Sequence, residues 1–285
     1  MDFGMPTLIE LNSIEENATL CKSLNLQFIE LNMNLPLFSI LSCIDKNNPE
    51  LNSLLEKLIS IKNKYGIYYT IHLDENFNFA DFNSYINDSY LKTLNAVITN
   101  SQKIKCPIIN MHLNKGVYFT LPQKKVYLFE KYNEHYTKCA NNFLDFCEEN
   151  LSNNSTTKIC IENTDGWKDF EKHIIQTFLK KSYFGLTFDI GHSQAINNVD
   201  EEFIFMNKNK LFHFHIHDGT LPANNTYGKN HLTLGTGNIN LQNRLELAKT
   251  NNCRCVIETK TIQSLKDSVE WLKNNTNFTK ILCQS

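Results

Sequence analysis

Ionisable side chains recur inside several strand-like runs of this sequence, on one of each strand's two faces. Side chains two residues apart share a face, so the apolar residues of Ile109–Leu113 face one way while Asn110 and His112 face the other. In other strand-like runs, apolar residues likewise alternate, or are compatible with alternating, with six further ionisable residues: His72, Glu162, Asp189, His215, His217 and Glu258. Carboxylates that converge in one cavity repel each other and are costly to bury, so such a set implies a compensating cation. A lone histidine is more often a hydrogen-bonded core residue, but that explanation does not cover the whole set.

The runs that carry these residues alternate with longer amphipathic stretches, which is the pattern of repeated βα units around a parallel sheet. We expect eight strands, at Met5–Leu11, Phe28–Asn34, Ile67–Leu73, Pro107–Leu113, Lys158–Asn163, Phe184–Ile190, Leu211–His217 and Cys253–Thr259. Between them we expect helices at Ile14–Leu24, Leu51–Lys64, Leu91–Lys103, Val126–Glu149, Phe170–Leu179, Leu241–Lys249 and Ile262–Leu272, with a less distinct one near Glu201–Met206.

This arrangement in 285 residues predicts an α/β protein in which residues 1–285 form a single (β/α)8 TIM barrel as one domain. Barrel enzymes place their active sites at the C-terminal ends of the strands. If the large apolar side chains pack under the helices, six residues project into one cavity at that end: His72, His112, Glu162, Asp189, His215 and Glu258. The irregular loop Leu221–Asn230 follows the seventh strand on the same side.

Composition narrows the class of protein. Hydrophobic residues make up 41% and charged residues 20% of the chain, as in ordinary globular proteins. No leader pattern or run of eighteen apolar residues occurs, so we expect a cytoplasmic protein with no membrane partner. The nine cysteines are odd in number and irregularly spaced, which indicates buried reduced thiols. The net charge is −2 and the chain has only two arginines, Arg244 and Arg254, so we do not expect a nucleic-acid partner.

The motifs in these strands resemble the xylose isomerase-like barrel superfamily, which includes sugar isomerases and epimerases as well as endonuclease IV. The resemblance covers essentially the whole chain and rests on the order and strand placement of several short motifs. They are Ile161-Glu162-Asn163-Thr164, Phe188-Asp189-Ile190-Gly191-His192, His215-Ile216-His217-Asp218-Gly219, the segment His231 to Ile239, and Val256-Ile257-Glu258-Thr259.

The resemblance implies a metal site. In the epimerase-like members two glutamates, an aspartate and a histidine bind the metal, which here correspond to Glu162, Asp189, His215 and Glu258. Oxygen-rich ligation with one imidazole suits manganese, zinc, magnesium or cobalt. The larger set of endonuclease IV adds four histidines: His72, His112, His192 and His231. One position departs from that set, because Lys229 stands where endonuclease IV has an aspartate, and no carboxylate occurs from Thr220 to Leu245.

Three functions follow as hypotheses. The first is a sugar or sugar-phosphate isomerase or epimerase, in which the metal stabilises an enediolate and Glu162 and Glu258 transfer protons on opposite faces of the substrate. His192 would take part in catalysis, and His192, His217 and Lys229 would contact a small carbohydrate-like substrate. The alternative is a metal-dependent hydrolase or phosphodiesterase of the endonuclease IV type, with His72, His112 and Glu162 as a second metal site. A binding barrel without catalysis ranks last. The oligomeric state is left open, a homo-oligomer included.

Overall fold

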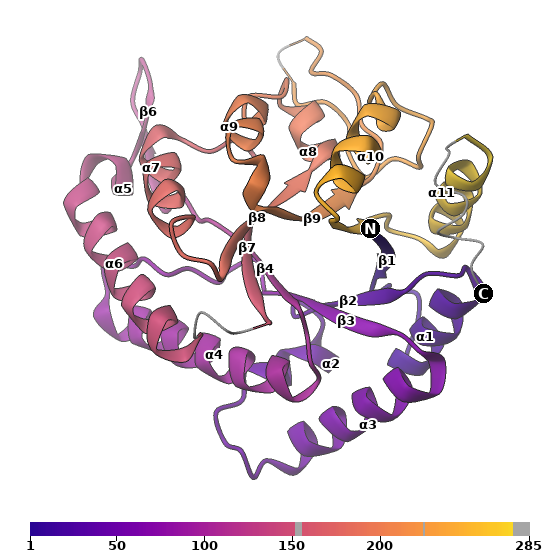
Figure 1. Cartoon of the computed structure of the whole chain (residues 1–285). Coiled ribbons are helices and arrows are strands. Elements are labelled where there is room, and N and C mark those ends of the chain that lie inside the picture. Colours follow the sequence, from indigo (N-terminus) through magenta and orange to yellow (C-terminus); the bar gives the residue numbers. More distant parts are fainter. Residues whose placement is uncertain (152–155, 225, 276–285) are drawn as a thin grey trace.

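The computed structural model describes residues 1–151, 156–224 and 226–275, in which eight parallel strands close into a barrel (Figure 1). The barrel strands are β1 (Asp2–Pro6), β2 (Phe28–Asn32), β3 (Tyr68–His72), β4 (Ile108–His112), β7 (Lys158–Glu162), β8 (Phe184–Asp189), β9 (Leu211–Ile216) and β10 (Arg254–Ile257). Each strand pairs with its neighbour in sequence order, and β10 closes the ring by pairing with β1. The predicted (β/α)8 barrel is confirmed.

Helices surround the ring of strands on its outer side (Figure 1). They are α1 (Ile14–Ser23), α2 (Pro36–Ser39), α3 (Pro49–Tyr65), α4 (Ser84–Lys103), α5 (Leu128–Lys131), α6 (Asn133–Asn150), α7 (Asp169–Phe178), α8 (Ile190–Ala195), α9 (Glu201–Met206), α10 (Leu241–Thr250) and α11 (Ile262–Asn275). Short 3₁₀ helices lie at Ile40–Ser42 (η1) and Lys208–Lys210 (η2). Within the described ranges, no helix combines the length and the apolar character needed to cross a membrane.

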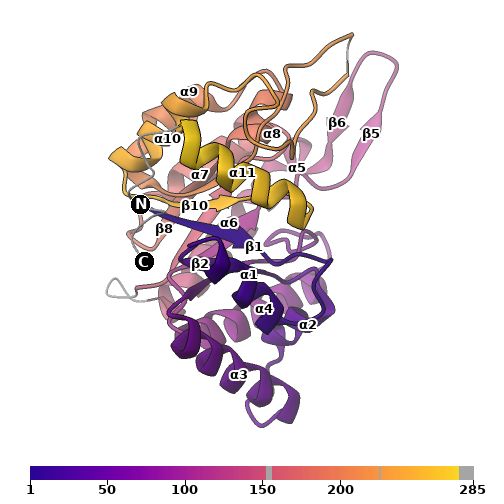
Figure 2. The same cartoon turned by 90° about the vertical axis from the view of Figure 1, so that its right-hand side faces the viewer.

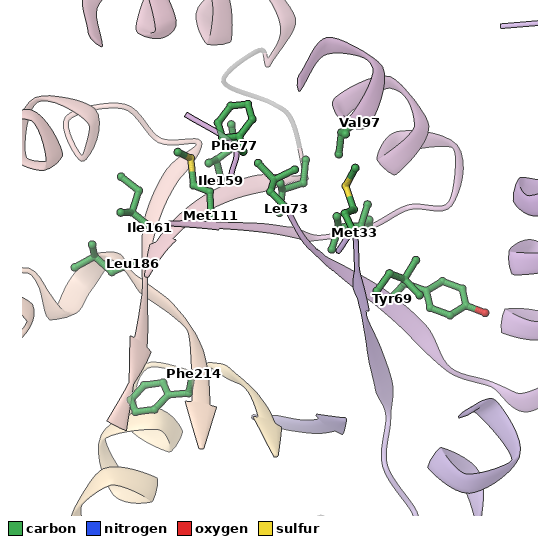
Figure 3. Close-up of a cluster of buried hydrophobic side chains, with 14 of the residues drawn as sticks. Met33, Tyr69, Leu73, Phe77, Val97, Met111, Ile159, Ile161, Leu186 and Phe214 are labelled. Atoms are coloured by element: carbon green, nitrogen blue, oxygen red, sulfur yellow. The ribbon is translucent and has the colours of Figure 1, made fainter. Parts of the chain in front are cut away.

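The two faces of each strand differ in polarity, as the alternation predicts. Ile159, Ile161, Met111 and Leu186 lie on the outer side of the strands, where the helices cover them (Figure 3). The opposite faces meet inside the barrel. There the Thr187 hydroxyl on β8 donates a hydrogen bond to the Asn110 side chain on β4, with β7 between the two strands. Burial of the apolar outer face stabilises the barrel at roughly 25 cal/mol per Å². The polar face is thereby left to line the interior.

The first strand lies nearer the N-terminus than the prediction of Met5–Leu11. It ends at Pro6, and the chain then leaves the sheet. The Leu8 amide donates a hydrogen bond to the side-chain oxygen of Asn17. The Leu11 amide donates to the Leu8 carbonyl, which closes a turn. The residues after Pro6 therefore form a turn instead of extending the strand, with Leu8 buried and Ile9 exposed.

The predicted single helix Val126–Glu149 is wrong in its first part. Residues Tyr118–Thr120 (β5) and Lys125–Tyr127 (β6) form an antiparallel hairpin that projects from the barrel (Figure 2), followed by the short helix α5 and the long helix α6. Aromatic and β-branched side chains such as Tyr118 and Val126 favour strand pairing over helix there. Helix α4 is also longer than predicted, because Asn83 caps its first turn through a bond to the Tyr85 amide.

Cysteines in the described part of the chain are all free, and Cys283 lies outside that part. Seven of them are buried, whereas Cys43 is partly exposed. Burial raises the pKa of the Cys21 and Cys106 thiols to about 12. The prediction of buried reduced thiols is confirmed for the described residues, with Cys43 as the partial exception.

Candidate metal centre

Six of the eight barrel strands bring an ionisable side chain to one end of the barrel. These residues stand at, or within one position of, the C-terminal ends of their strands: His72, His112, Glu162, Asp189, His215 and Glu258. They form two groups that share one carboxylate, Glu162. The structure thus brings together all six residues that the sequence placed in one cavity.

The first group surrounds one ring nitrogen of a buried histidine. Nδ1 of His215 lies 3.1 Å from Oε1 of Glu162, 3.1 Å from Oε2 of Glu258 and 3.8 Å from Oδ2 of Asp189. His215 and Asp189 are inaccessible to solvent, while the Glu258 side chain retains 18% exposure. The four ligand atoms lie within 4.8 Å of one another. Three carboxylates and one imidazole at this spacing form a donor set for a divalent cation.

The second group lies on the other side of Glu162. Nε2 of His72 and Nε2 of His112 are 3.4 and 3.3 Å from Oε2 of Glu162. Nδ1 of His72 donates to the Leu73 carbonyl at 2.7 Å, so Nε2 is the nitrogen left to face the carboxylate. The Asn110 amide also donates to Oε2 of Glu162. Glu162 therefore presents one oxygen to each group, as a bridging ligand would.

Opposite charges shift the pKa values of Glu162, Glu258 and His215 toward their ionised forms. Burial raises the pKa of the Glu162 carboxyl, but the opposite charges of His215 and His112 outweigh it and hold that pKa well below its usual range. The same competition between burial and His215 lowers the pKa of Glu258. Burial lowers the pKa of His215, yet Glu162, Glu30 and Glu258 together raise it well above normal. Several acidic groups are thus concentrated around the imidazole of His215.

The donor set fits a bound divalent cation. Nε2 of His112 and Oε2 of Glu258 are buried and lack a hydrogen-bond partner among the described residues. A buried polar atom without a partner costs about 1–3 kcal/mol, a cost that a coordinated ion would remove. Both atoms belong to the two groups described above, one to each. The site chemistry therefore agrees with metal ligation.

The structure places His217 behind Asp189. The main-chain N–H of His231 donates to Nδ1 of His217 at 2.7 Å, so the ring proton resides on Nε2, which donates to Oδ2 of Asp189 at 3.1 Å. His217 is fully buried. Both of its ring nitrogens are engaged, which leaves none for the predicted contact with a substrate hydroxyl. Its position is that of a residue orienting a metal ligand.

His192 and His231 lie beside His217 and form a third histidine group with it. Nδ1 of His231 is 3.2 Å from the Glu258 carbonyl oxygen and so carries the proton, which leaves Nε2 as a free acceptor. Burial lowers the pKa of His231 to about 4. Nδ1 of His192 lies 3.2 Å from the Asn230 amide nitrogen. Because His217 offers no free nitrogen, this group is a poorer ion site than the other two.

Lys229, the position that departs from the endonuclease IV set, is exposed in the loop after β9. Its amide donates to the Thr220 hydroxyl, and its carbonyl accepts from the Thr220 amide, at 2.9 Å each. Within the loop Leu221–Asn230, Asn225 lies outside the described residues. No carboxylate replaces the missing aspartate, because none occurs in this part of the sequence.

Sequence reasoning missed two acidic residues that the structure places close to the site. Asp218 accepts the amides of Gly219 and Gly235 at 2.9 Å each and that of Ile239 at 3.2 Å. It thereby fixes the segment that contains Gly235. Glu30 is buried beneath His215. Its signal was a lone carboxylate within the apolar run Phe28–Leu31.

The chain is thus a closed (β/α)8 barrel with clustered carboxylates and histidines at the C-terminal ends of its strands. The family model of the xylose isomerase-like TIM barrel matches residues 18–275, and the chain belongs to that family. A protein of unknown function from Methanocaldococcus jannaschii is 26% identical over 233 residues, covering 78% of this chain and 83% of its own.

Solved structures share the fold along the full length. A D-tagatose 3-epimerase-like protein superposes with a TM-score of 0.71 at 21% identity, covering 99% of this chain and 98% of its own. The IOLI protein, described with a bound zinc atom, superposes with a TM-score of 0.68 at 15% identity, covering 96% of this chain and 97% of its own. At these identities the likeness establishes the fold.

Proposed function

We propose that this protein is a divalent-metal-dependent sugar or sugar-phosphate isomerase or epimerase whose ion is held by Glu162, Asp189, His215 and Glu258. The observation that carries the proposal is the arrangement of three carboxylates around Nδ1 of a buried histidine. Family membership supports it, as does the fold shared with a D-tagatose 3-epimerase-like protein. The zinc atom described for the IOLI protein supports metal dependence, and manganese, zinc, magnesium and cobalt all suit these donors.

A bound divalent cation would polarise a substrate carbonyl and so acidify the neighbouring C–H bond. Glu258 is the carboxylate best placed to accept that proton, because it is 18% exposed and its Oε1 is turned toward Lys260 and His231, at 3.6 and 4.0 Å. Glu162 turns its second oxygen the opposite way, toward His72 and His112. The two carboxylates therefore stand on opposite sides of the ligand set, as proton transfer on two faces of a substrate requires.

A small cavity adjoins Glu258 and offers a place for the substrate. Its volume is about 150 Å³, and it lies between the loops that follow β1, β2 and β10. The hydroxyl of Thr259 on its wall is buried without a hydrogen-bond partner among the described residues. Lys260 supplies a cation at the same wall. These polar atoms suit a small hydroxylated ligand rather than an apolar one.

His192 and His231 are proposed to contact substrate hydroxyls. His231 would act as a neutral acceptor through Nε2, since its pKa lies near 4 and Nδ1 bonds the Glu258 carbonyl. His192 is partly exposed, its ring lies 5.1 Å from that of His231, and it stays a predicted substrate contact. Lys229, on the exposed loop beyond them, stays a predicted substrate contact.

A metal-dependent hydrolase or phosphodiesterase is the second candidate. The group of His72, His112 and Glu162 favours it, because two-metal catalysis requires an ion on each side of a bridging carboxylate. Lys229 opposes it, because a lysine stands where the endonuclease IV set has an acidic ligand. The number of bound ions separates the two candidates. With two ions, both oxygens of Glu162 would bind metal. With one ion in the first group, the oxygen that faces His72 and His112 would stay available to exchange a proton.

The test combines metal analysis with two activity assays on the purified protein. Elemental analysis gives the ion count, and NMR in deuterated water detects proton exchange at the α-carbon across a panel of ketoses and ketose phosphates. We expect exchange that Glu258→Gln abolishes together with most bound metal, whereas the exposed Glu270→Gln on α11 retains both. Cleavage of an abasic-site duplex with zinc or manganese is expected to be negligible. Two ions per chain with robust cleavage would instead support the hydrolase.

A further inference from the structure

Glu30 is a buried carboxylate that belongs to neither metal group. It projects from β2 into the barrel interior and is 2% exposed. Oε2 of Glu30 accepts hydrogen bonds from the Thr70 hydroxyl at 3.0 Å and from Nε2 of His213 at 2.8 Å. An isolated buried charge would be expensive. The neighbouring strands β3 and β9 thus supply the donors that hold this carboxylate in one place.

The other oxygen of Glu30 faces the central histidine of the candidate metal centre. Oε1 lies 2.9 Å from Nε2 of His215, within ion-pair distance, and Nε2 has no other partner among the described residues. The opposite nitrogen of the same ring, Nδ1, is the one that faces Glu162, Asp189 and Glu258. The imidazole therefore stands between an acidic residue below it and the ligand oxygens above it.

An ion between Glu30, His213 and His215 is a different interpretation of these three residues. Two ligand atoms at 2.0–2.1 Å from one tetrahedral ion are about 3.3 Å apart. The two nitrogen–oxygen distances here are 2.8 and 2.9 Å, which are hydrogen-bond lengths. The Thr70 hydroxyl takes a further position on Glu30. Thr70 and His213 therefore hold Glu30 by hydrogen bonds, an arrangement that supports His215 rather than an ion.

We propose that Glu30 is a positioning residue that keeps the Nε2 proton of His215 and so directs the Nδ1 lone pair of that ring to a divalent cation. Metal-bound histidines generally donate their second N–H to such a partner, which fixes the ring and its tautomer. Thr70 and His213 hold Glu30 in turn. The proposal rests on the proposed function only in assuming that the first group binds a metal.

The experiment measures metal binding rather than turnover. The folded protein is stripped with a chelator and titrated with Co²⁺ alone, with the d–d absorption spectrum reporting ligand geometry and competition with a chelating dye reporting affinity. Glu30→Gln keeps the side-chain shape but sets an amide against one of its donors. We expect Co²⁺ affinity to fall about 10- to 100-fold with an altered spectrum, and the His215 ¹⁵N signals to show a mixture of tautomers.

Two further variants make the result specific. Glu56→Gln, an exposed residue on α3, is the matched control and is expected to bind Co²⁺ as the parent does. Thr70→Val removes one donor to Glu30 and should weaken binding in the same direction by a smaller factor, even where Glu30→Gln fails to fold. Parental affinity and spectrum in both Glu30→Gln and Thr70→Val would overturn the proposal while leaving the metal site intact. Failure of the parent protein to bind Co²⁺ would instead refute the proposed function.

Discussion

Gly191 is the position at which one added methyl group should disturb the candidate metal centre most directly. It follows Asp189 by two residues in α8, and a Cβ atom there would lie 1.9 Å from Cε1 and Nδ1 of His217. The His217 ring cannot simply turn aside, because it is fully buried and bonded to both Asp189 and the His231 amide. Gly191→Ala should therefore displace the ring, and with it the carboxylate of Asp189.

The size of the effect follows from the geometry. Ordinary van der Waals contact begins near 3.4 Å, so relief of the 1.9 Å approach needs a movement of about 1.5 Å, which breaks at least one of the two hydrogen bonds of His217. Overpacking a buried site costs about 1–3 kcal/mol, and a buried group left without its partner costs about 1–3 kcal/mol more. The free energy of unfolding should thus fall by about 2–6 kcal/mol.

Urea unfolding of a double-mutant cycle tests this reasoning. Gly191→Ala, His217→Ala and the double variant are compared, because removal of the ring makes room for the methyl group. In the His217→Ala background, Gly191→Ala is expected to cost less than about 1 kcal/mol. Gly66→Ala is the control, since no heavy atom lies within 4 Å of its added Cβ and only its φ of +66° opposes the change. Additive effects of the two substitutions would refute a collision with His217.

Two further predictions concern buried ionisable groups. Burial raises the pKa of the Glu171 carboxyl from 4.5 to about 8, so stability should fall as pH rises through that interval, by at most about 5 kcal/mol. Glu171→Gln should flatten this dependence in urea unfolding at pH 4.5–9, and an unchanged slope would contradict the assignment. Iodoacetamide at pH 8 should label Cys43 in native protein well before the seven buried cysteines of the described chain, as peptide mass spectrometry can show.

The sequence allowed the barrel and its six inward-facing ionisable residues to be predicted because period-2 alternation is strong in the central strands. In Ile109–Leu113, for example, a buried outer face of apolar residues leaves Asn110 and His112 only the interior. Neighbouring strands of a closed barrel share that interior, so residues far apart in sequence converge. The strand ends then set which side chains reach the same layer.

Other features depend on contacts that alternation does not encode. The end of β1 is set by Pro6 and by the Asn17 side chain that captures the next part of the chain. The hairpin after β4 competes with a helix over the same residues, and its pairing decides the outcome. The role of His217 depends on which group donates to which ring nitrogen, and that is known only once the His231 amide is placed. Sequence patterns report faces of strands rather than hydrogen-bond directions.

Closure of the barrel has a consequence for synthesis of the chain. The Glu10 carboxylate accepts the amide of Ile262, 252 residues later, next to the pairing of β1 with β10. At ribosomal rates of about 5–20 residues per second, the first strand waits roughly 13–50 s for its partner. Throughout that interval the edge of β1 that pairs with β10 has no partner strand. An ion can therefore meet its complete ligand set only after Glu258 has been made.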